Sequence, residues 1–140
     1  MERFRRPESV LVVILTEAKE FLLLERRRPP GYWQSVTGSL EWGESPDHAA
    51  WREVTEETGI SRGVMVNLQW TQTYEISPAF GKTYAPGVTR NLEHAFSLQI
   101  PAPVEIRLSE HVRYRWMSDD EALTTVSSST NRAVIAELRY

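Results

Sequence analysis

The segment from Ser45 to Gly59 carries both a start and a stop signal for a helix, and it anchors the expected fold. Ser45 is a favoured N-cap residue, Pro46 suits the first helical position, and Asp47 complements the partial positive charge at a helix start. Gly59 is the matching stop, because glycine tolerates the left-handed conformation that ends many helices. Small apolar residues lie between these signals, so the sequence predicts a packed helix over residues 46–58.

Runs of apolar, β-favouring residues lie on both sides of this helix in the sequence. The expected strands cover residues 10–16, 21–24, 33–37, 64–76, 92–100 and 112–117. A loop rich in proline and glycine is expected at 77–88, a second helix after Ser118, and a last helix from about Asn131. This order of elements is typical of an α/β protein with one mixed sheet covered by helices.

Length and composition exclude several classes of protein. The 140 residues contain no repeat or linker, so we expect one domain over 1–140, and the absence of cysteine leaves only oxygen and histidine ligands for any metal. The longest aliphatic run has six residues, Val10 to Leu15, whereas a membrane helix needs about 20. A net charge of −3 without a long basic stripe argues against nucleic-acid binding. We therefore expect a cytoplasmic protein with no membrane, nucleic-acid or obligate protein partner.

Three glutamates fall on one face of the predicted helix. Glu53, Glu56 and Glu57 are spaced i, i+3 and i+4, so their like charges destabilise the helix unless a cation is near. Arg52 is the i,i+4 partner of Glu56 alone, and a further cation is therefore expected near the other two. Glu44 precedes the helix, where it can fold back to the same place. Carboxylate oxygens favour Mg²⁺ or Mn²⁺ over zinc or copper.

This acidic stripe has two interpretations. A solvated acidic face is the common one, but the flanking glycines and the concentration of acids on a single stripe favour a metal site. Magnesium usually shares its coordination shell with water and substrate phosphates. The metal-site interpretation therefore predicts phosphate chemistry, in which a metal-bound water is activated and charge on the leaving group is stabilised.

The pattern from Gly38 to Ile60 resembles the 23-residue signature of the Nudix hydrolases, which cleave nucleoside diphosphates linked to another group. Gly38 is followed after five residues by Glu44, and after seven more by the run Arg52-Glu53-Val54-Thr55-Glu56-Glu57-Thr58-Gly59-Ile60. The resemblance implies a hydrolase with an α/β/α sandwich, in which a mixed β-sheet is flanked by helices. It also implies that Glu53, Glu56 and Glu57 are metal-binding and catalytic, and that Arg52 holds them in place.

Segments outside the signature resemble the branch of this family that acts on a pterin triphosphate in folate biosynthesis. These segments are 6–14, 33–39, 84–91 and the pair Glu110-His111. The resemblance implies that Glu110 is a further metal ligand and that His111 faces the substrate. It implies substrate contacts from a scattered set: Arg5, Arg26, Thr37, Tyr74, Glu75 and Ser128.

Three functions follow as alternatives. The resemblance favours Mg²⁺-dependent hydrolysis of 7,8-dihydroneopterin triphosphate to the monophosphate and pyrophosphate by metal-activated water, with Glu56 either a further ligand or the base. A second alternative is pyrophosphohydrolysis of ordinary or oxidised nucleoside triphosphates. The third is a non-catalytic binding module of the same fold, which the intact signature disfavours. Trp33 and Trp70 are candidate platforms for stacking a ring.

Overall fold

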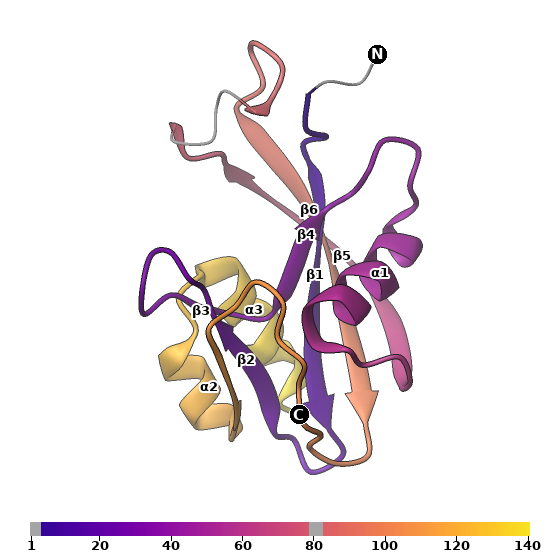
Figure 1. Cartoon of the computed structure of the whole chain (residues 1–140), viewed down its shortest axis with the longest axis vertical. Helices are drawn as coiled ribbons and strands as arrows, with labels where there is room; N and C mark the ends of the chain where they lie inside the picture. Colours follow the sequence, from indigo (N-terminus) through magenta and orange to yellow (C-terminus); the bar gives the residue numbers. More distant parts are fainter. Residues whose placement is uncertain (1–3, 79–82) are drawn as a thin grey trace.

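A computed structural model describes residues 4–78 and 83–140 (Figure 1). In that part, three helices and seven strands follow one another as β1 (Glu8–Thr16), β2 (Phe21–Glu25), β3 (Trp33–Gln34), β4 (Val36–Ser39), α1 (Pro46–Thr58), β5 (Val64–Glu75), β6 (Arg90–Ile100), β7 (Arg113–Met117), α2 (Asp119–Thr125) and α3 (Ser129–Leu138). None of the described helices is long and apolar enough to cross a membrane.

Strand β1 lies at the centre of a mixed sheet. It runs parallel to β6 along its whole length, and β5 pairs antiparallel with the far side of β6. On the other side, β1 pairs antiparallel with β4 over residues 9–12 and with β2 only at Leu15. Strand β2 in turn pairs with β3 and β7. Because β2 and β4 use different ends of β1, the sheet splits on this side.

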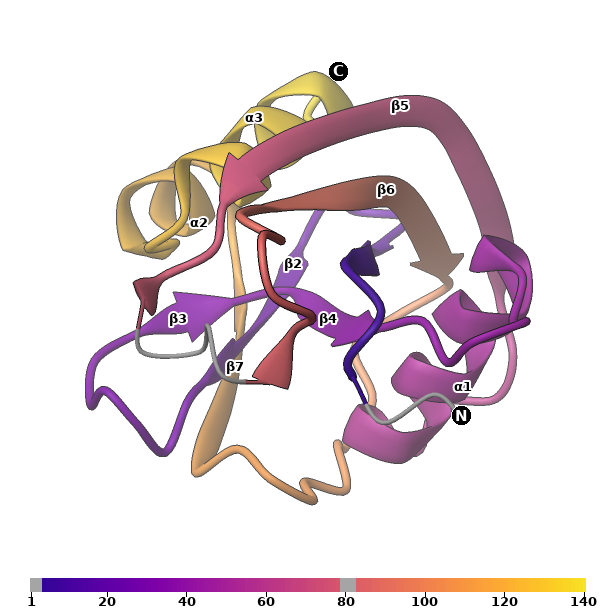
Figure 2. The same ribbon diagram turned by 90° about the horizontal axis from the view of Figure 1, so that it is seen from above.

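Two apolar cores lie on the two faces of the sheet, because successive side chains of a strand point to opposite faces. Along β1, the set Val10, Val12 and Ile14 packs with the helix α1, whereas the set Leu11, Val13 and Leu15 packs with α2 and α3. Figure 2 shows α1 on one side of the sheet and the helix pair on the other. The expected three-layer α/β/α sandwich is confirmed, as is the burial of both faces of the first two strands.

Helix α1 begins and ends at the residues that the sequence predicts. The Ser45 hydroxyl accepts a hydrogen bond from the backbone N–H of His48 at 3.2 Å. Gly59 has φ 80°, and its N–H donates to the carbonyl of Thr55 at 3.0 Å. The buried residues Ala49, Ala50 and Val54 pack against the sheet, and this packing fixes how the acidic stripe of α1 lies against β4.

The extended piece expected at 33–37 is two strands. Between them, the backbone N–H of Ser35 donates to Asn131 Oδ1 at 2.8 Å, and Ser35 Oγ accepts from Asn131 Nδ2 at 2.9 Å. These bonds replace ladder bonds at Ser35, so the chain leaves β2 and joins β1. Within the loop expected at 77–88, residues 79–82 lie outside the described part.

Candidate active site

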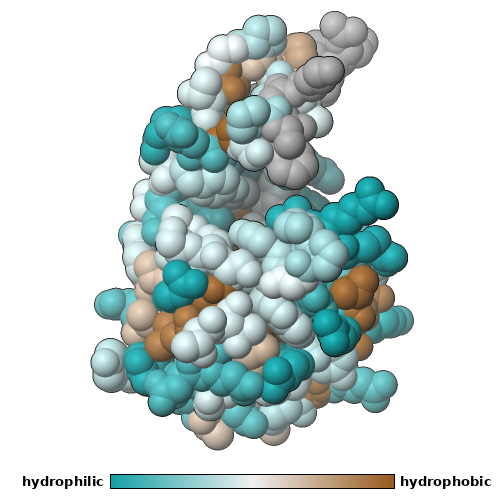
Figure 3. Space-filling view, turned by 90° about the vertical axis from the view of Figure 1, so that its left-hand side faces the viewer, coloured by the Kyte–Doolittle hydropathy of each residue, from teal (hydrophilic) through white to brown (hydrophobic). Residues whose placement is uncertain are grey.

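A cavity of about 720 Å³ opens between β4 and the start of α3, and it adjoins a second cavity of about 260 Å³ over the acidic face of α1. The larger volume is in the usual range for sites that bind small molecules. The residues that line both cavities are Arg5, Thr37, Gly38, Ser39, Glu57 and Glu110. Figure 3 shows a hollow in this side of the molecule, and the coloured residues below and beside it are mostly hydrophilic. The two cavities therefore form one continuous site.

The residues expected from the sequence gather around this site. Four carboxylates line the smaller cavity: Glu53, Glu56, Glu57 and Glu110. The larger cavity is lined by the expected substrate residues Arg5, Arg26, Thr37, Tyr74, Glu75, His111 and Ser128. These residues are spread over most of the length of the chain. The fold therefore brings together positions that the family resemblance had identified in separate sequence segments.

Arg52 organises the acidic end of the site. Its guanidinium donates to both carboxylate oxygens of Glu44, at 2.7 and 2.8 Å, and this pairing lowers the pKa of Glu44 to about 2. Nη1 donates to Glu53 at 3.0 Å and to Glu56 at 3.4 Å. The expectation that Glu44 folds back onto the stripe is confirmed. The expectation that Arg52 would relieve only Glu56 was wrong, because its side chain turns back far enough to reach Glu53.

Gly38 lets β4 and α1 approach closely. A Cβ atom at this position would lie 2.1 Å from the carboxyl carbon of Glu53 and 2.2 Å from one of its oxygens. Only glycine leaves that space free. The Glu53 carboxylate is therefore held between the backbone of β4 and the guanidinium of Arg52.

Glu57 is the most buried carboxylate of the set, with 5% of its surface exposed. Burial raises its pKa, and the neighbouring charges of Glu53 and Glu110 raise it further. Its Oε1 atom has no hydrogen-bond partner among the described residues. Burial also raises the pKa of Glu53. Adjacent carboxylates whose pKa values are raised in this way, one of them with an unpartnered oxygen, fit a divalent cation.

The four carboxylates line the smaller cavity, but their oxygens do not converge on one position within it. Among the described residues, no three acidic or histidine side chains converge closely enough to hold a metal ion as they stand. Glu53 is engaged by Arg52, whereas the Glu56 side chain is 57% exposed. The donor set is thus chemically suited to Mg²⁺ or Mn²⁺, and its side chains would have to shift to converge on an ion.

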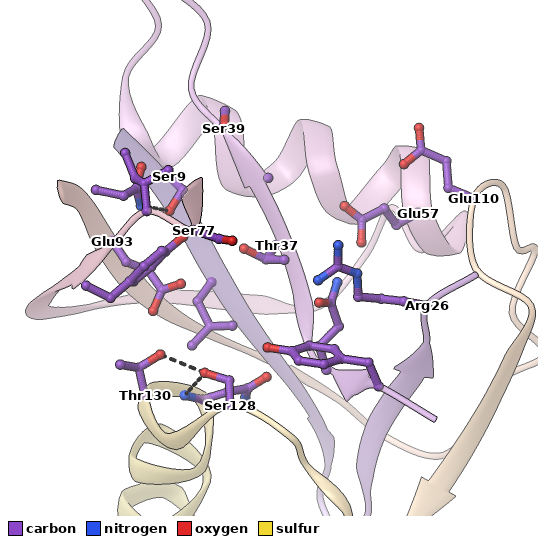
Figure 4. Close-up of a pocket in the computed structure, with 18 of the residues that line it drawn as sticks. Ser9, Arg26, Thr37, Ser39, Glu57, Ser77, Glu93, Glu110, Ser128 and Thr130 are labelled. Atoms are coloured by element: carbon purple, nitrogen blue, oxygen red, sulfur yellow. Dashed lines mark hydrogen bonds between the residues drawn. The ribbon is translucent and has the colours of Figure 1, made fainter. Parts of the chain in front are cut away.

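Two arginines place positive charge beside the carboxylates. Arg5 Nε donates to Ser39 Oγ at 2.7 Å, and its guanidinium lies over the Tyr84 ring, 5.5 Å from the centroid. Arg26 lies over the ring of Tyr32 at 5.0 Å, and Figure 4 shows its guanidinium pointing toward the Glu57 carboxylate. Guanidinium groups are suited to bind phosphate oxygens in pairs, so this end of the site is suited to a polyphosphate held next to a metal.

His111 contributes a neutral ring to the wall of the larger cavity. Burial lowers its pKa, and its Nε2 lies 3.2 Å from Gln34 Nε2. Because the Gln34 amide nitrogen is a donor, His111 Nε2 accepts and Nδ1 carries the hydrogen. Nδ1 is buried without a partner in the described part of the chain. The ring therefore has a donor available for a ligand.

Sequence reasoning missed several polar residues of the larger cavity. Ser9, Asn91 and Glu93 line it and are buried. One signal was present: residues 91, 93 and 95 point to one face of a strand, and Ala95 at that spacing is an ordinary core residue. Two polar residues on such an inward face mark a site.

The two tryptophans that we expected to stack against a ligand ring lie elsewhere. Trp33 and Trp70 pack against the apolar core under α2 and α3, and neither belongs to the lining of the two cavities. Of the phenylalanine, tyrosine and tryptophan residues that the structure describes, those that line the larger cavity are Tyr32, Tyr74 and Tyr84. Any ring bound there would lie among tyrosines.

Comparison with known proteins gives concordant matches. Residues 5–138 match the NUDIX domain family. The dihydroneopterin triphosphate diphosphatase of Escherichia coli K12 is 41% identical over 139 residues, which cover 96% of this chain and 93% of that protein. The Haemophilus influenzae protein of the same name is 34% identical over 145 residues and covers 100% of this chain and 92% of its own length.

Solved structures agree with the sequence matches. The E. coli dihydroneopterin triphosphate pyrophosphohydrolase superposes with a TM-score of 0.90 at 40% identity, covering 98% of this chain and 97% of that one. A Caenorhabditis elegans Ap4A hydrolase shares the fold with a TM-score of 0.67 at 24% identity, covering 93% of each chain. The family match spans nearly all of the described residues. The chain belongs to the NUDIX domain family.

Proposed function

We propose that this protein hydrolyses 7,8-dihydroneopterin triphosphate to the monophosphate and pyrophosphate, with Mg²⁺ as the cofactor. The observation that carries the proposal is the continuous site, in which clustered carboxylates and arginines adjoin a cavity large enough for a ring. Relatives that are named for this substrate support the proposal, because their alignments cover 96% and 100% of the chain.

Glu53, Glu57 and Glu110 are the residues that would hold the metal. Their donor atoms are all oxygens, which suits Mg²⁺ and equally Mn²⁺. A divalent ion bound there lowers the pKa of a coordinated water and stabilises negative charge on phosphate oxygens. Glu56 has the most exposed side chain of the three helix acids, and it serves as a further ligand or as the base that accepts a proton from the attacking water.

The other residues position these groups and the substrate. Arg52 fixes Glu53 through a direct hydrogen bond. Arg5 and Arg26 supply positive charge for the phosphates, whereas His111 and Ser128 line the part of the cavity that would take the rest of the substrate. Water is the nucleophile, so no covalent enzyme intermediate is required.

The proposal also specifies the setting of the reaction. Residues 1–140 act as one catalytic domain on a small-molecule triphosphate, in the cytoplasm, and the chemistry needs neither nucleic acid nor a protein partner. This matches the concentration of functional groups in a cavity within one chain.

A comparison of substrates tests the assignment. We expect kcat/KM for 7,8-dihydroneopterin triphosphate to exceed the values for the four common nucleoside triphosphates and for 8-oxo-dGTP by about 100-fold or more, since a site that hydrogen-bonds one ring disfavours others. Pyrophosphate release under Mg²⁺ is the measurement. A higher value for any nucleotide would instead identify a nucleotide-directed enzyme, and no release from any triphosphate would identify a binding module.

A further inference from the structure

The end of the larger cavity that lies away from the metal-binding carboxylates is lined by buried polar groups. Figure 4 shows Glu93, Ser9 and Thr130 on one side of the cavity and Glu57, Glu110 and Arg26 on the other, with Thr37 between them. Glu93 and Asn91 stand two residues apart on β6, so both point to the same face of the sheet. Only 5% and 1% of their surfaces are exposed.

Two acceptor atoms at this end have no partner in the part of the chain that the structure describes. Asn91 Nδ2 donates to Ser9 Oγ at 2.7 Å, and the other amide atom, Oδ1, has no partner among the described residues. Oδ1 of Asn91 and Oε1 of Glu93 are both buried, and neither has a hydrogen-bond partner in the described residues. Buried acceptors are normally paired, because each unpaired one costs about 1–3 kcal/mol. Two such atoms on the same face of β6, both in residues that line the cavity, therefore point to donors on a ligand.

Burial of the Glu93 carboxyl destabilises the folded protein. Burial raises its pKa to about 7, and the one influence that lowers it is a hydrogen bond with Thr130. No arginine or lysine of the described chain is among the groups that act on it. Burial raises the pKa of Tyr74, which lines the same cavity, and the negative charge of Glu93 raises it further. A buried carboxyl without a cation is typical of a binding function more than of a structural one.

We propose that Glu93 is a specificity-determining residue that binds the adjacent ring N–H and amino group of a 2-amino-4-oxopyrimidine ring, with Asn91 accepting a further donor of the same ligand. Such a ring occurs in pterins and in guanine. Its N–H and NH₂ form two parallel donors that match the two oxygens of a carboxylate. The choice between these two rings as the physiological ligand rests on the proposed function.

The position of Glu93 explains how one cavity separates ring recognition from chemistry. Arg26 points toward the Glu57 carboxylate at the metal end (Figure 4), and Arg5 lines both cavities, whereas Tyr74 and Tyr84 line only the cavity that contains Glu93. A triphosphate directed toward the metal end leaves its ring among the tyrosines and the free acceptors. The bond to Glu93 forms equally in the ground and transition states, so its loss should change KM more than kcat.

The variant Glu93→Gln tests this directly. Glutamine has the same shape but presents one donor, which would face a donor on the ring. At about pH 8 we expect KM for 7,8-dihydroneopterin triphosphate to rise by about 10- to 100-fold, with kcat within about threefold of wild type. Glu137→Gln, which removes an exposed carboxylate of α3, should leave both constants unchanged. The melting temperature of Glu93→Gln should equal or exceed that of wild type, because a buried charge is removed.

Binding without turnover distinguishes this inference from the proposed function. By calorimetry without metal, wild type should bind pterin at least about tenfold more tightly than lumazine, which carries an oxo group in place of the 2-amino group. Glu93→Gln should lose or reverse that preference. If wild type shows the preference but does not hydrolyse the pterin triphosphate, the proposed function fails and the inference stands. Equal or absent binding of both rings to wild type, or an unchanged preference and KM in Glu93→Gln, overturns it.

Discussion

Glu57→Gln should lower kcat by about 1,000-fold or more without unfolding the protein, because removing a group that stabilises charge in the transition state has effects of this size. Glu57 is the buried centre of the carboxylate set, with its pKa raised by burial, Glu53 and Glu110. Glutamine keeps the shape and removes the negative charge that a divalent cation requires. The loss should therefore appear in kcat and in metal affinity together.

The stability of Glu57→Gln separates a metal ligand from a structural residue. A carboxyl whose pKa is raised on folding destabilises the native state as the pH rises above its ordinary pKa, and glutamine has no such cost. In EDTA at about pH 8, the variant should melt at or above the wild-type temperature. Affinity for Mn²⁺, measured by calorimetry, should fall, while Glu137→Gln retains wild-type binding and turnover. Near-normal turnover in Glu57→Gln would refute its assignment to the metal site.

Gly38→Ala should reduce kcat/KM by about 100-fold, because effects of this size follow when a catalytic group is displaced by about 1 Å. The added Cβ would lie 2.1 Å from the Glu53 carboxyl carbon, at the mobile end of a long side chain. The carboxylate can swing away from β4, so α1 stays in place. It would then lose the 3.0 Å bond from Arg52, and the melting temperature should change by only a few degrees.

A double-mutant cycle shows whether Gly38 acts through Glu53. Glu53→Gln alone should reduce kcat/KM by at least as much as Gly38→Ala. If the glycine matters because it makes room for Glu53, the double variant should be little worse than Glu53→Gln alone. Losses that multiply would show that Gly38 has a separate role, and wild-type activity in Gly38→Ala would contradict the close approach of β4 and α1.

Local signals in the sequence were enough for most of the fold. The caps Ser45 and Gly59 defined α1 to the residue, because cap geometry depends on a few neighbouring atoms. The two-face burial of β1 was visible in its unbroken aliphatic run. The break at Ser35 was not visible, since it depends on Asn131, 96 positions away. Long-range side-chain bonds of this kind leave no periodic pattern.

The site shows the same division between local and long-range information. The acidic stripe followed from helical spacing, and the family resemblance implied Glu110 and the basic residues that now line one site. The reach of Arg52 to Glu53 and the tyrosine lining depend on rotamers and tertiary packing. Glu93 was missed for a further reason. Its signal is the spacing of Asn91 and Glu93 with the core residue Ala95, and this spacing predicts a site only once that face of the strand is known to point inward.

The central claim is that these carboxylates support hydrolysis of a pterin triphosphate with loss of pyrophosphate. Its most direct test is product analysis of 7,8-dihydroneopterin triphosphate incubated with the protein in Mg²⁺, in EDTA, and in EDTA followed by excess Mg²⁺. We predict equal amounts of monophosphate and pyrophosphate with Mg²⁺, no turnover in EDTA, and full recovery when Mg²⁺ is restored. Release of orthophosphate with a diphosphate product, or turnover that EDTA leaves unchanged, would contradict the account.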